Sequence, residues 1–181
     1  MPLKFINITS DNTPLFHSLM KDYGKELDGH QNRTTDPAVL IEWADTIIRK
    51  SEAESFRLLR LCYDGNEIIG FLYATIDQPN DTGYHRTGHG YIMEFYVLPE
   101  HRRKGYGSAM LKYIEQFFRG RGVAQIYLTA APITGKPFWS ATGFTSKGEF
   151  SPDNGQEIFE KEFSPDRADK ANARFSYSSF V

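Results

Sequence analysis

Apolar residues recur along the chain at two spacings, which separate predicted helices from predicted strands. Leu15, Leu19 and Tyr23 lie four residues apart, so we expect a helix over about residues 14–27 with one buried face. An aspartate followed by a proline, a common helix start, opens a second helical pattern over about residues 37–49. Both predicted helices precede the main run of strands.

Strand-like runs fill most of the remaining chain. Residues 56–64 and 67–77 flank Gly65 and Asn66, a pair typical of a tight turn between antiparallel strands. Residues 78–90 are rich in turn formers and predict a loop. Further strands are expected at 5–9, 91–98, 124–130, 144–150 and 157–163, and further helices at 104–119 and 136–142. This order of elements predicts helices that cover a mixed sheet.

Composition indicates one domain followed by a polar tail. The chain has 181 residues, of which 40% are hydrophobic, enough for one well-buried core and too few for two. We therefore expect a single domain over residues 1–163 and a C-terminal tail over residues 164–181. Phe175, Tyr177 and Phe180 predict that this tail docks on the same subunit, on a neighbouring subunit or in a lattice contact, which leaves a homodimer open.

Charge and cysteine content argue against several classes of function. The 21 basic and 23 acidic residues leave a net charge of -2, so we expect no nucleic-acid partner. Cys62 is the sole cysteine, which rules out an intrachain disulfide and a cysteine-based zinc site, and the five histidines are too scattered to bind a metal. With neither a secretory leader nor ~20 consecutive apolar residues, the protein is expected to be cytoplasmic, without membrane contact.

The segment 98–111, LPEHRRKGYGSAML, places a basic run and two glycines at the start of a predicted helix. Gly105 and Gly107 lack a Cβ, so a ligand can approach the main chain closely there. The amides of residues 103–108 have no acceptor within the helix, and the helix dipole adds roughly half a positive charge at that end. The pattern favours phosphate binding, and the alternative is a tight turn with solvated charges.

Two other phosphate-binding motifs do not fit the chain. Met110 stands where a dinucleotide-binding fingerprint would need its third glycine. Gly135 and Lys136 are followed by Pro137, whereas a Walker loop continues with serine or threonine.

Segment 98–111 and the residues before it resemble the acyl-CoA-binding motif of the GNAT superfamily of N-acetyltransferases. That motif reads Gln or Arg, two residues, Gly, any residue, then Gly or Ala, directly after a strand that ends Val-x-Pro. Arg102, Gly105 and Gly107 match the motif, and Val97 and Pro99 match the lead-in. The downstream segment FWSATGF is similar to a Tyr-x-x-x-Gly-Phe segment of the family.

This resemblance, which spans about residues 3–163, implies an α+β fold of three layers. A mixed, mostly antiparallel central sheet of six to seven strands would be flanked by about four helices, with one splayed strand pair. The cosubstrate would be acetyl-CoA, with its diphosphate on the amides of residues 103–108 and its pantetheine arm in the splay. The implied cofactor-binding residues are Phe95, Val97, Arg102, Arg103, Lys104, Gly105, Tyr106, Gly107, Ser108 and Trp139.

Glu94 is the candidate general base. A lysine-like amine has a pKa of about 10.4 and must lose a proton before it attacks. Glu94 lies in a strand expected to be covered on both faces, where an unpaired carboxylate is costly, so we expect it to face the substrate. The alternative is a structural ion pair or hydrogen bond. Tyr96, two residues on along the same face, is expected to line the acceptor site, to donate a proton, or to pack as an ordinary aromatic residue.

Departures from the family concern the pantetheine contact and the proton donor. Pro132 stands where the family often has an asparagine, and it has no side-chain amide to offer the pantetheine arm. The family tyrosine that protonates the leaving thiolate falls on Trp139, whose indole cannot act as an acid near neutral pH. The general acid therefore stays open between Tyr96, Tyr127, another phenol and water.

The resemblance implies an enzyme, an acetyl-CoA-dependent N-acetyltransferase that uses direct attack in a ternary complex. Its acceptor would be a primary amine of a small molecule, a peptide or a protein. The alternatives are a non-catalytic acyl-CoA-binding or sensing module on the same fold and a protein-interaction domain that binds no nucleotide. Asp22, Glu26 and Asp28 are expected either to attract a cationic acceptor or to form a solvated helix face.

Overall fold

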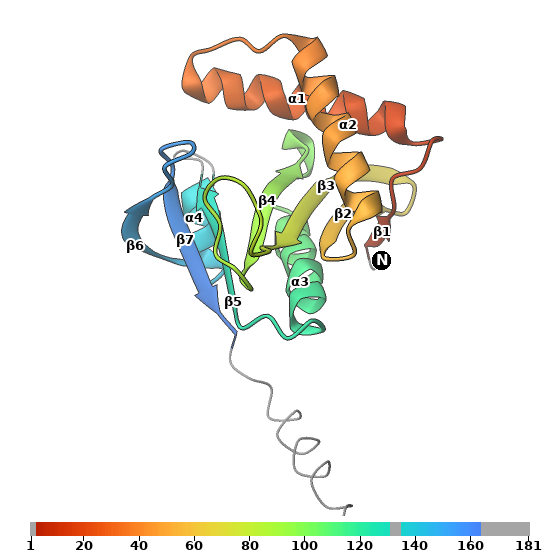
Figure 1. The fold of residues 1–181 in the computed structure, drawn as a ribbon. Helices are drawn as coiled ribbons and strands as arrows, with labels where there is room; N and C mark the ends of the chain where they lie inside the picture. Colours follow the sequence, from red (N-terminus) through yellow and green to blue (C-terminus); the bar gives the residue numbers. More distant parts are fainter. Residues whose placement is uncertain (1–2, 131–134, 164–181) are drawn as a thin grey trace, which may run out of the picture.

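A seven-stranded mixed sheet forms the centre of the described residues, 3–130 and 135–163, in a computed structural model (Figure 1). The strand order is β1-β2-β3-β4-β5-β7-β6, and neighbouring strands are antiparallel except for the parallel pair β4 and β5. Its strands are β1 (Lys4–Ile6), β2 (Arg57–Asp64), β3 (Glu67–Ile76), β4 (Gly90–Val97), β5 (Gln125–Ala130), β6 (Thr145–Phe150) and β7 (Glu157–Glu162). Pro132 and the tail residues 164–181 lie outside the described residues, so the expectations for them stay predictions.

Helices cover both faces of the sheet, with α1 and α2 on one face and α3 and α4 on the other (Figure 1). The helices are α1 (Thr13–Gln31), α2 (Pro37–Ala53), α3 (Tyr106–Arg119) and α4 (Gly135–Ala141), and a short 3-10 helix (Pro99–His101) precedes α3. The start of α2 is as predicted, since the Asp36 side chain accepts a hydrogen bond from the Ala38 amide at 2.8 Å. The predicted fold class is confirmed.

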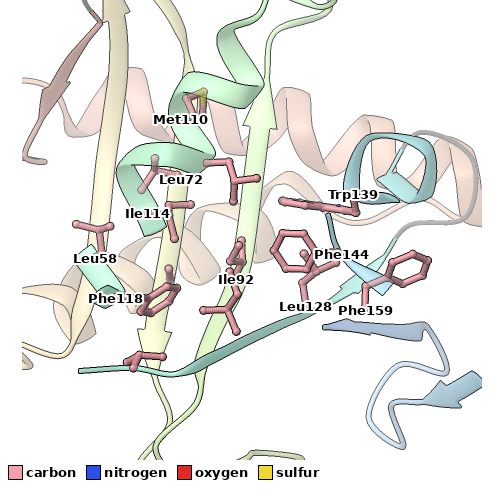
Figure 2. Close-up of a cluster of buried hydrophobic side chains, with 14 of the residues drawn as sticks. Leu58, Leu72, Ile92, Met110, Ile114, Phe118, Leu128, Trp139, Phe144 and Phe159 are labelled. Atoms are coloured by element: carbon pink, nitrogen blue, oxygen red, sulfur yellow. The ribbon is translucent and has the colours of Figure 1, made fainter. Parts of the chain in front are cut away.

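Two apolar clusters fill the two interfaces between helices and sheet. In the cluster under α3, Met110, Ile114 and Phe118 lie over apolar residues of β2, β3 and β4 (Figure 2). Cys62 is fully buried in this cluster, and burial raises the pKa of its thiol to about 12, so it packs as an apolar core residue with a protonated thiol. The second cluster joins α1 and α2 to the opposite face and includes Tyr96.

Helix α1 is longer than predicted, because the polar segment after residue 27 does not end it. The helix continues to Gln31, and Asn32 follows in a left-handed conformation. Asp28 is only 7% exposed, and its carboxylate accepts hydrogen bonds from Arg33 Nε and from the main chain and hydroxyl of Thr35. Asp28 therefore holds the α1–α2 connection and does not lie on a solvated helix face.

The first strand is shorter than predicted. Only Lys4–Ile6 pairs with β2, and the expected extension to Thr9 forms a turn instead. The Asn12 side chain donates a hydrogen bond to the Asn7 carbonyl at 2.9 Å and accepts one from the Thr9 amide at 2.8 Å. These main-chain groups are therefore not available to the sheet.

A β-bulge in β4 decides which residues of this strand share a face. Tyr73 pairs with Glu94 and Ala74 pairs with Ile92, so Met93 has no partner on β3. The extra residue reverses the alternation of side chains. As a result Ile92 belongs to the cluster under α3, whereas Glu94 points to the face covered by α1.

Close contact between β3 and β4 depends on Gly70. A Cβ at this position would lie 1.9 Å from the carbonyl oxygen of Tyr96. We expect Gly70→Ala to lower the free energy of unfolding by roughly 1–3 kcal/mol or more, because the two strands must move apart. Urea unfolding would measure this change. Gly29→Ala is the matched control, since a Cβ at this helical position meets nothing within 4 Å, and it should leave stability unchanged or raised.

Candidate active site

The parallel strands β4 and β5 separate soon after they begin. They pair only at Gly90 with Ile126 and at Tyr91 with Tyr127, while β4 continues to Val97. This is the expected splay. The amide of Leu98 donates to the Ile69 carbonyl, and main-chain groups alternate in direction along an antiparallel strand. The main-chain groups of residues 95 and 97 therefore point away from β3, to the side that β5 has left.

The turn after β4 presents unpaired main-chain amides. Arg103 and Gly105 both have left-handed backbone conformations, with φ of 62° and 87°, and Gly105 caps α3. Ala109 is the first residue of this helix start whose amide donates within the chain, to the Gly105 carbonyl at 3.2 Å. Within the described part of the chain, the amides of residues 103–108 have no acceptor. A Cβ at Gly105 would meet nothing within 4 Å, so the turn is open at that point.

Side chains in the turn divide into exposed and engaged ones. Arg103, Lys104 and Ser108 are exposed. Tyr106 donates its hydroxyl to Asp64 at 2.7 Å, which fixes the start of α3 against β2. The turn can therefore present positive charge and main-chain amides to an anion, whereas the phenol of Tyr106 is committed to the fold.

Arg102 ties the turn to two other elements. Its Nε donates to the Val97 carbonyl at 2.8 Å, and its terminal nitrogen donates to Glu26 Oε2 of α1 at 2.6 Å. The guanidinium also lies 5.8 Å from the centre of the Tyr96 ring. Glu26 is consequently paired with an arginine and is not a free charge for attracting a cation.

Glu94 accepts a hydrogen bond from the hydroxyl of Tyr23 in α1, with 2.7 Å between the phenol oxygen and Oε2. Burial raises the pKa of the Glu94 carboxyl to about 8, and the Tyr23 hydrogen bond acts in the opposite direction. A carboxylate with a pKa in this range can take a proton from a substrate and release it again near neutral pH.

Tyr96 lies on the same face as Glu94, as predicted, and is only 4% exposed. Its ring is 5.3 Å from Tyr23 and 5.8 Å from Phe71. Burial raises the pKa of the Tyr96 phenol to about 12, so this hydroxyl keeps its proton at neutral pH. The Tyr96 ring therefore packs in this apolar cluster, and its protonated phenol lies on the same face of β4 as the candidate base.

Trp139 belongs to an aromatic cluster on the opposite face of β4. Its ring centre lies 5.1 Å from that of Phe95 and 4.9 Å from that of Phe138. The centre of the Phe144 ring, labelled beside Trp139 in Figure 2, is 5.2 Å away. Phe138, which the sequence did not single out, also contacts the turn: a Cβ at Gly107 would come within 3.1 Å of its ring. The side chains of Phe95 and Trp139 thus pack on the face of β4 that α3 and α4 cover. Glu94 and Tyr96 lie on the other face, which α1 covers.

Tyr127 is unsuited to the open role of proton donor. Its hydroxyl donates to the buried carboxylate of Asp77, and its ring stacks on Tyr91 with 4.6 Å between centres. Burial and the hydrogen bond to Asp77 raise the pKa of this phenol. Tyr127 sits where β4 and β5 are still paired, so it stabilises the closed end of the splay.

Two hollows on the surface lie away from the turn of residues 103–108. A groove of about 730 Å³ runs along Arg57–Arg60 of β2 and the second half of α3, and none of the predicted site residues lines it. A smaller hollow of about 280 Å³ lies between α1 and α2. It includes Trp43, whose ring is 6.3 Å from that of Tyr23. Neither hollow is lined by Glu94 or by the free amides of residues 103–108, which lie in β4 and in the turn after it.

Within residues 3–130 and 135–163, no three His, Cys, Asp or Glu side chains are grouped as metal ligands. None of the helices described is both long enough and apolar enough to cross a membrane.

Solved structures with the same fold are acetyltransferases by description. The PaiA N-acetyltransferase of Thermoplasma acidophilum, in complex with coenzyme A, aligns at a TM-score of 0.65 and 16% identity, over 90% of this chain and 100% of that one. An acetyltransferase of Thermus thermophilus aligns at 0.67 and 18%, over 90% and 98% of the two chains. A Salmonella typhimurium acetyl transferase, described as modifying the N-terminal serine of ribosomal protein L7/L12, aligns at 0.65 and 16%, over 91% and 96%.

Sequence comparison identifies the family directly. No curated protein matches the chain with significance. Residues 14–137, more than half of the chain, match the model of the "Acetyltransferase (GNAT) family". This match runs from α1 through the turn of residues 103–108 into α4, so it covers the site assembled above. The chain belongs to the GNAT family of acetyltransferases.

Proposed function

We propose that the protein is an acetyl-CoA-dependent N-acetyltransferase that acetylates a primary amine by direct attack in a ternary complex. The observation that carries this proposal is the turn of residues 103–108, whose amides have no acceptor within the described chain and whose arginine and lysine side chains are exposed. Such a turn at a helix start binds a diphosphate well. Family membership and a structural neighbour described with coenzyme A support the same ligand.

The acyl arm of the cosubstrate would lie along the free side of β4. The main-chain groups of Phe95 and Val97 point away from β3, and the Val97 carbonyl already accepts from Arg102. The amide of Phe95 is then the donor that would face the thioester oxygen. A donor in this position stabilises the negative charge that develops on that oxygen when the amine attacks.

The side chains proposed for proton transfer, Glu94 and Tyr96, lie on the same face of β4. The protonated amine first loses one proton to Glu94, directly or through a water. The neutral nitrogen then forms a bond to the thioester carbon, the carbon–sulfur bond breaks, and the second proton on nitrogen passes to solvent as the amide forms. The thiolate leaves and takes up a proton, for which the protonated phenol of Tyr96 and water are the candidates. Trp139 supplies no acid here, because its indole nitrogen only donates hydrogen bonds.

Thiol release with a panel of amines tests the proposal. The panel should include a polyamine, an aminoglycoside, free amino acids and peptides with a free N-terminal serine, the last because a structural neighbour is described as modifying that group. Turnover of any amine supports the enzyme. Tight acetyl-CoA binding without turnover would favour the non-catalytic acyl-CoA module, a reading to which the absence of a phenol at Trp139 also points.

A thermal shift with acetyl-CoA separates the enzyme and the non-catalytic acyl-CoA module, which both bind the ligand, from a domain that binds no nucleotide. A ligand at 100 times its dissociation constant should add about 2.7 kcal/mol of stability. If acetyl-CoA at millimolar concentration leaves the melting temperature unchanged, the proposed function is wrong.

A further inference from the structure

The hydroxyl of Tyr23 is the one hydrogen-bond partner of the Glu94 carboxylate within the described residues. The two residues are 71 positions apart, on α1 and β4, and their oxygens are 2.7 Å apart. The Glu94 charge also acts on two other titratable groups, Tyr73 of β3 and Tyr91 of β4. After burial, which is the larger cause, it helps to raise the pKa of both phenols. Both are phenols, and no described lysine, arginine or histidine forms an ion pair with Glu94.

Packing fixes the Tyr23 ring. It meets Phe71 edge-on at 5.7 Å and 83°, and it also contacts Tyr96 at 5.3 Å and Trp43 at 6.3 Å. These contacts come from β3, β4 and α2, so the ring is held from three elements. The hydroxyl is therefore aimed at Glu94 by the packing of the whole layer and not by a flexible side chain.

The second carboxylate oxygen of Glu94, Oε1, has no hydrogen-bond partner among residues 3–130 and 135–163. Tyr23 donates to Oε2, and no described group donates to Oε1. No side-chain oxygen or nitrogen in the described part of the chain is both fully buried and without a hydrogen bond. Oε1 is therefore not fully buried, and it is the carboxylate oxygen that Tyr23 leaves unpaired.

We propose that Tyr23 is a positioning residue for the reaction: by donating to Oε2 of Glu94, it stabilises the ionised carboxylate and leaves Oε1 to take the amine proton. The inference rests on the proposed function, in which Glu94 accepts the amine proton. Tyr23 itself stays protonated, because burial and the neighbouring Glu94 charge raise the pKa of its phenol.

Tyr23→Phe removes the hydroxyl and leaves the ring contacts in place. The hydrogen bond from Tyr23 lowers the pKa of Glu94 against the effect of burial, so its loss should raise that pKa further. Because Glu94 acts as base only when ionised, kcat/KM of the variant should fall about tenfold relative to wild type at pH 7 and recover toward wild type at pH 10. The ratio of the two rates cancels the pH dependence of the amine.

Tyr63→Phe is the matched control. Tyr63 packs against the same apolar cluster, and no hydrogen bond of its hydroxyl is described. The ratio of its kcat/KM to wild type should be independent of pH. A ratio for Tyr23→Phe that is equally flat would overturn the inference, since a merely structural loss of activity would not move with pH.

A titration of the carboxylate keeps the test independent of any acceptor. In protein labelled with ¹³C at glutamate side-chain carboxyls, the Glu94 signal is identified by its loss in Glu94→Gln and followed from pH 5 to pH 10. We expect its midpoint at higher pH in Tyr23→Phe than in wild type. If the midpoint is unchanged in a protein that turns over an amine, the role of Tyr23 is refuted and the proposed function stands. If the midpoint shifts in a protein that binds no acetyl-CoA, the proposed function is refuted, although the hydrogen bond acts on Glu94 as stated.

Discussion

Replacing Glu94 by glutamine is expected to lower kcat/KM for the amine by about 10²- to 10⁴-fold, the usual contribution of a general base. Glutamine has the size of glutamate, and its amide oxygen can still accept from Tyr23, but it cannot take up a proton. Acetyl-CoA should bind as in wild type, because the diphosphate turn is untouched. Steady-state thiol release together with calorimetric titration of acetyl-CoA measures both quantities.

Glu52→Gln serves as the control for this substitution. Glu52 is an exposed residue near the end of α2, so the same chemical change there should leave kcat/KM unaltered. If Glu94→Gln retains wild-type kcat/KM with an amine that the wild type turns over, Glu94 is not the base and its hydrogen bond to Tyr23 is structural.

The contribution of Glu94 to kcat/KM of the wild type should decrease as the pH falls. Burial raises the pKa of Glu94 to about 8, so the carboxylate is mostly protonated below pH 8 and mostly ionised above it. The ratio of kcat/KM of wild type to that of Glu94→Gln, in which the pH dependence of the amine cancels, should therefore fall as the pH drops below 8, by about tenfold per unit.

Replacing Gly105 by aspartate is expected to weaken acetyl-CoA binding by about a hundredfold or more, since like charges about 4 Å apart repel by about 4 kcal/mol at an effective dielectric constant of 20. Gly105 has φ of 87° in the turn whose amides would hold the diphosphate, and the space around it is open. A carboxylate there would lie close to the bound phosphates. Isothermal titration with acetyl-CoA at two salt concentrations measures the loss.

Gly105→Asn is the matched variant for this test. Asparagine and aspartate have nearly the same size, and both tolerate the left-handed conformation better than other side chains do. The asparagine variant should therefore keep most of the affinity, and the difference between the two should shrink as salt rises. Equal losses in both variants would mean that the backbone of the turn, and not its charge, controls binding.

Local patterns along the chain predicted most of the fold. The hairpin at Gly65 and Asn66, the start of α2 and the helix after the glycine turn all lie where spacing and turn chemistry put them. These features depend on neighbours within a few residues, which the sequence displays directly. The end of α1 differs from the prediction because the Asp28 carboxylate accepts hydrogen bonds from Thr35, a contact that a helix-period pattern does not reveal.

Some parts of the candidate site could also be predicted from the local sequence, and others could not. The turn around Gly105 and the presence of a carboxylate in β4 could be read from consecutive residues, and Glu94 was singled out because an ionisable group stood in an apolar strand. Tyr23 was visible only as an apolar position of a helix. Nothing near it in the sequence indicates that its hydroxyl meets a residue 71 positions away.

Sequence by itself determined the family motif, the order of elements and the residue types available for chemistry, since each of these is local. Tertiary structure alone decided which face of β4 carries Glu94, through the bulge at Met93, because a bulge exists only relative to a partner strand. It also decided that Arg102 binds Glu26 and that Tyr23 binds Glu94. These contacts follow from packing α1 against the sheet, where long-range burial and not local propensity sets the geometry.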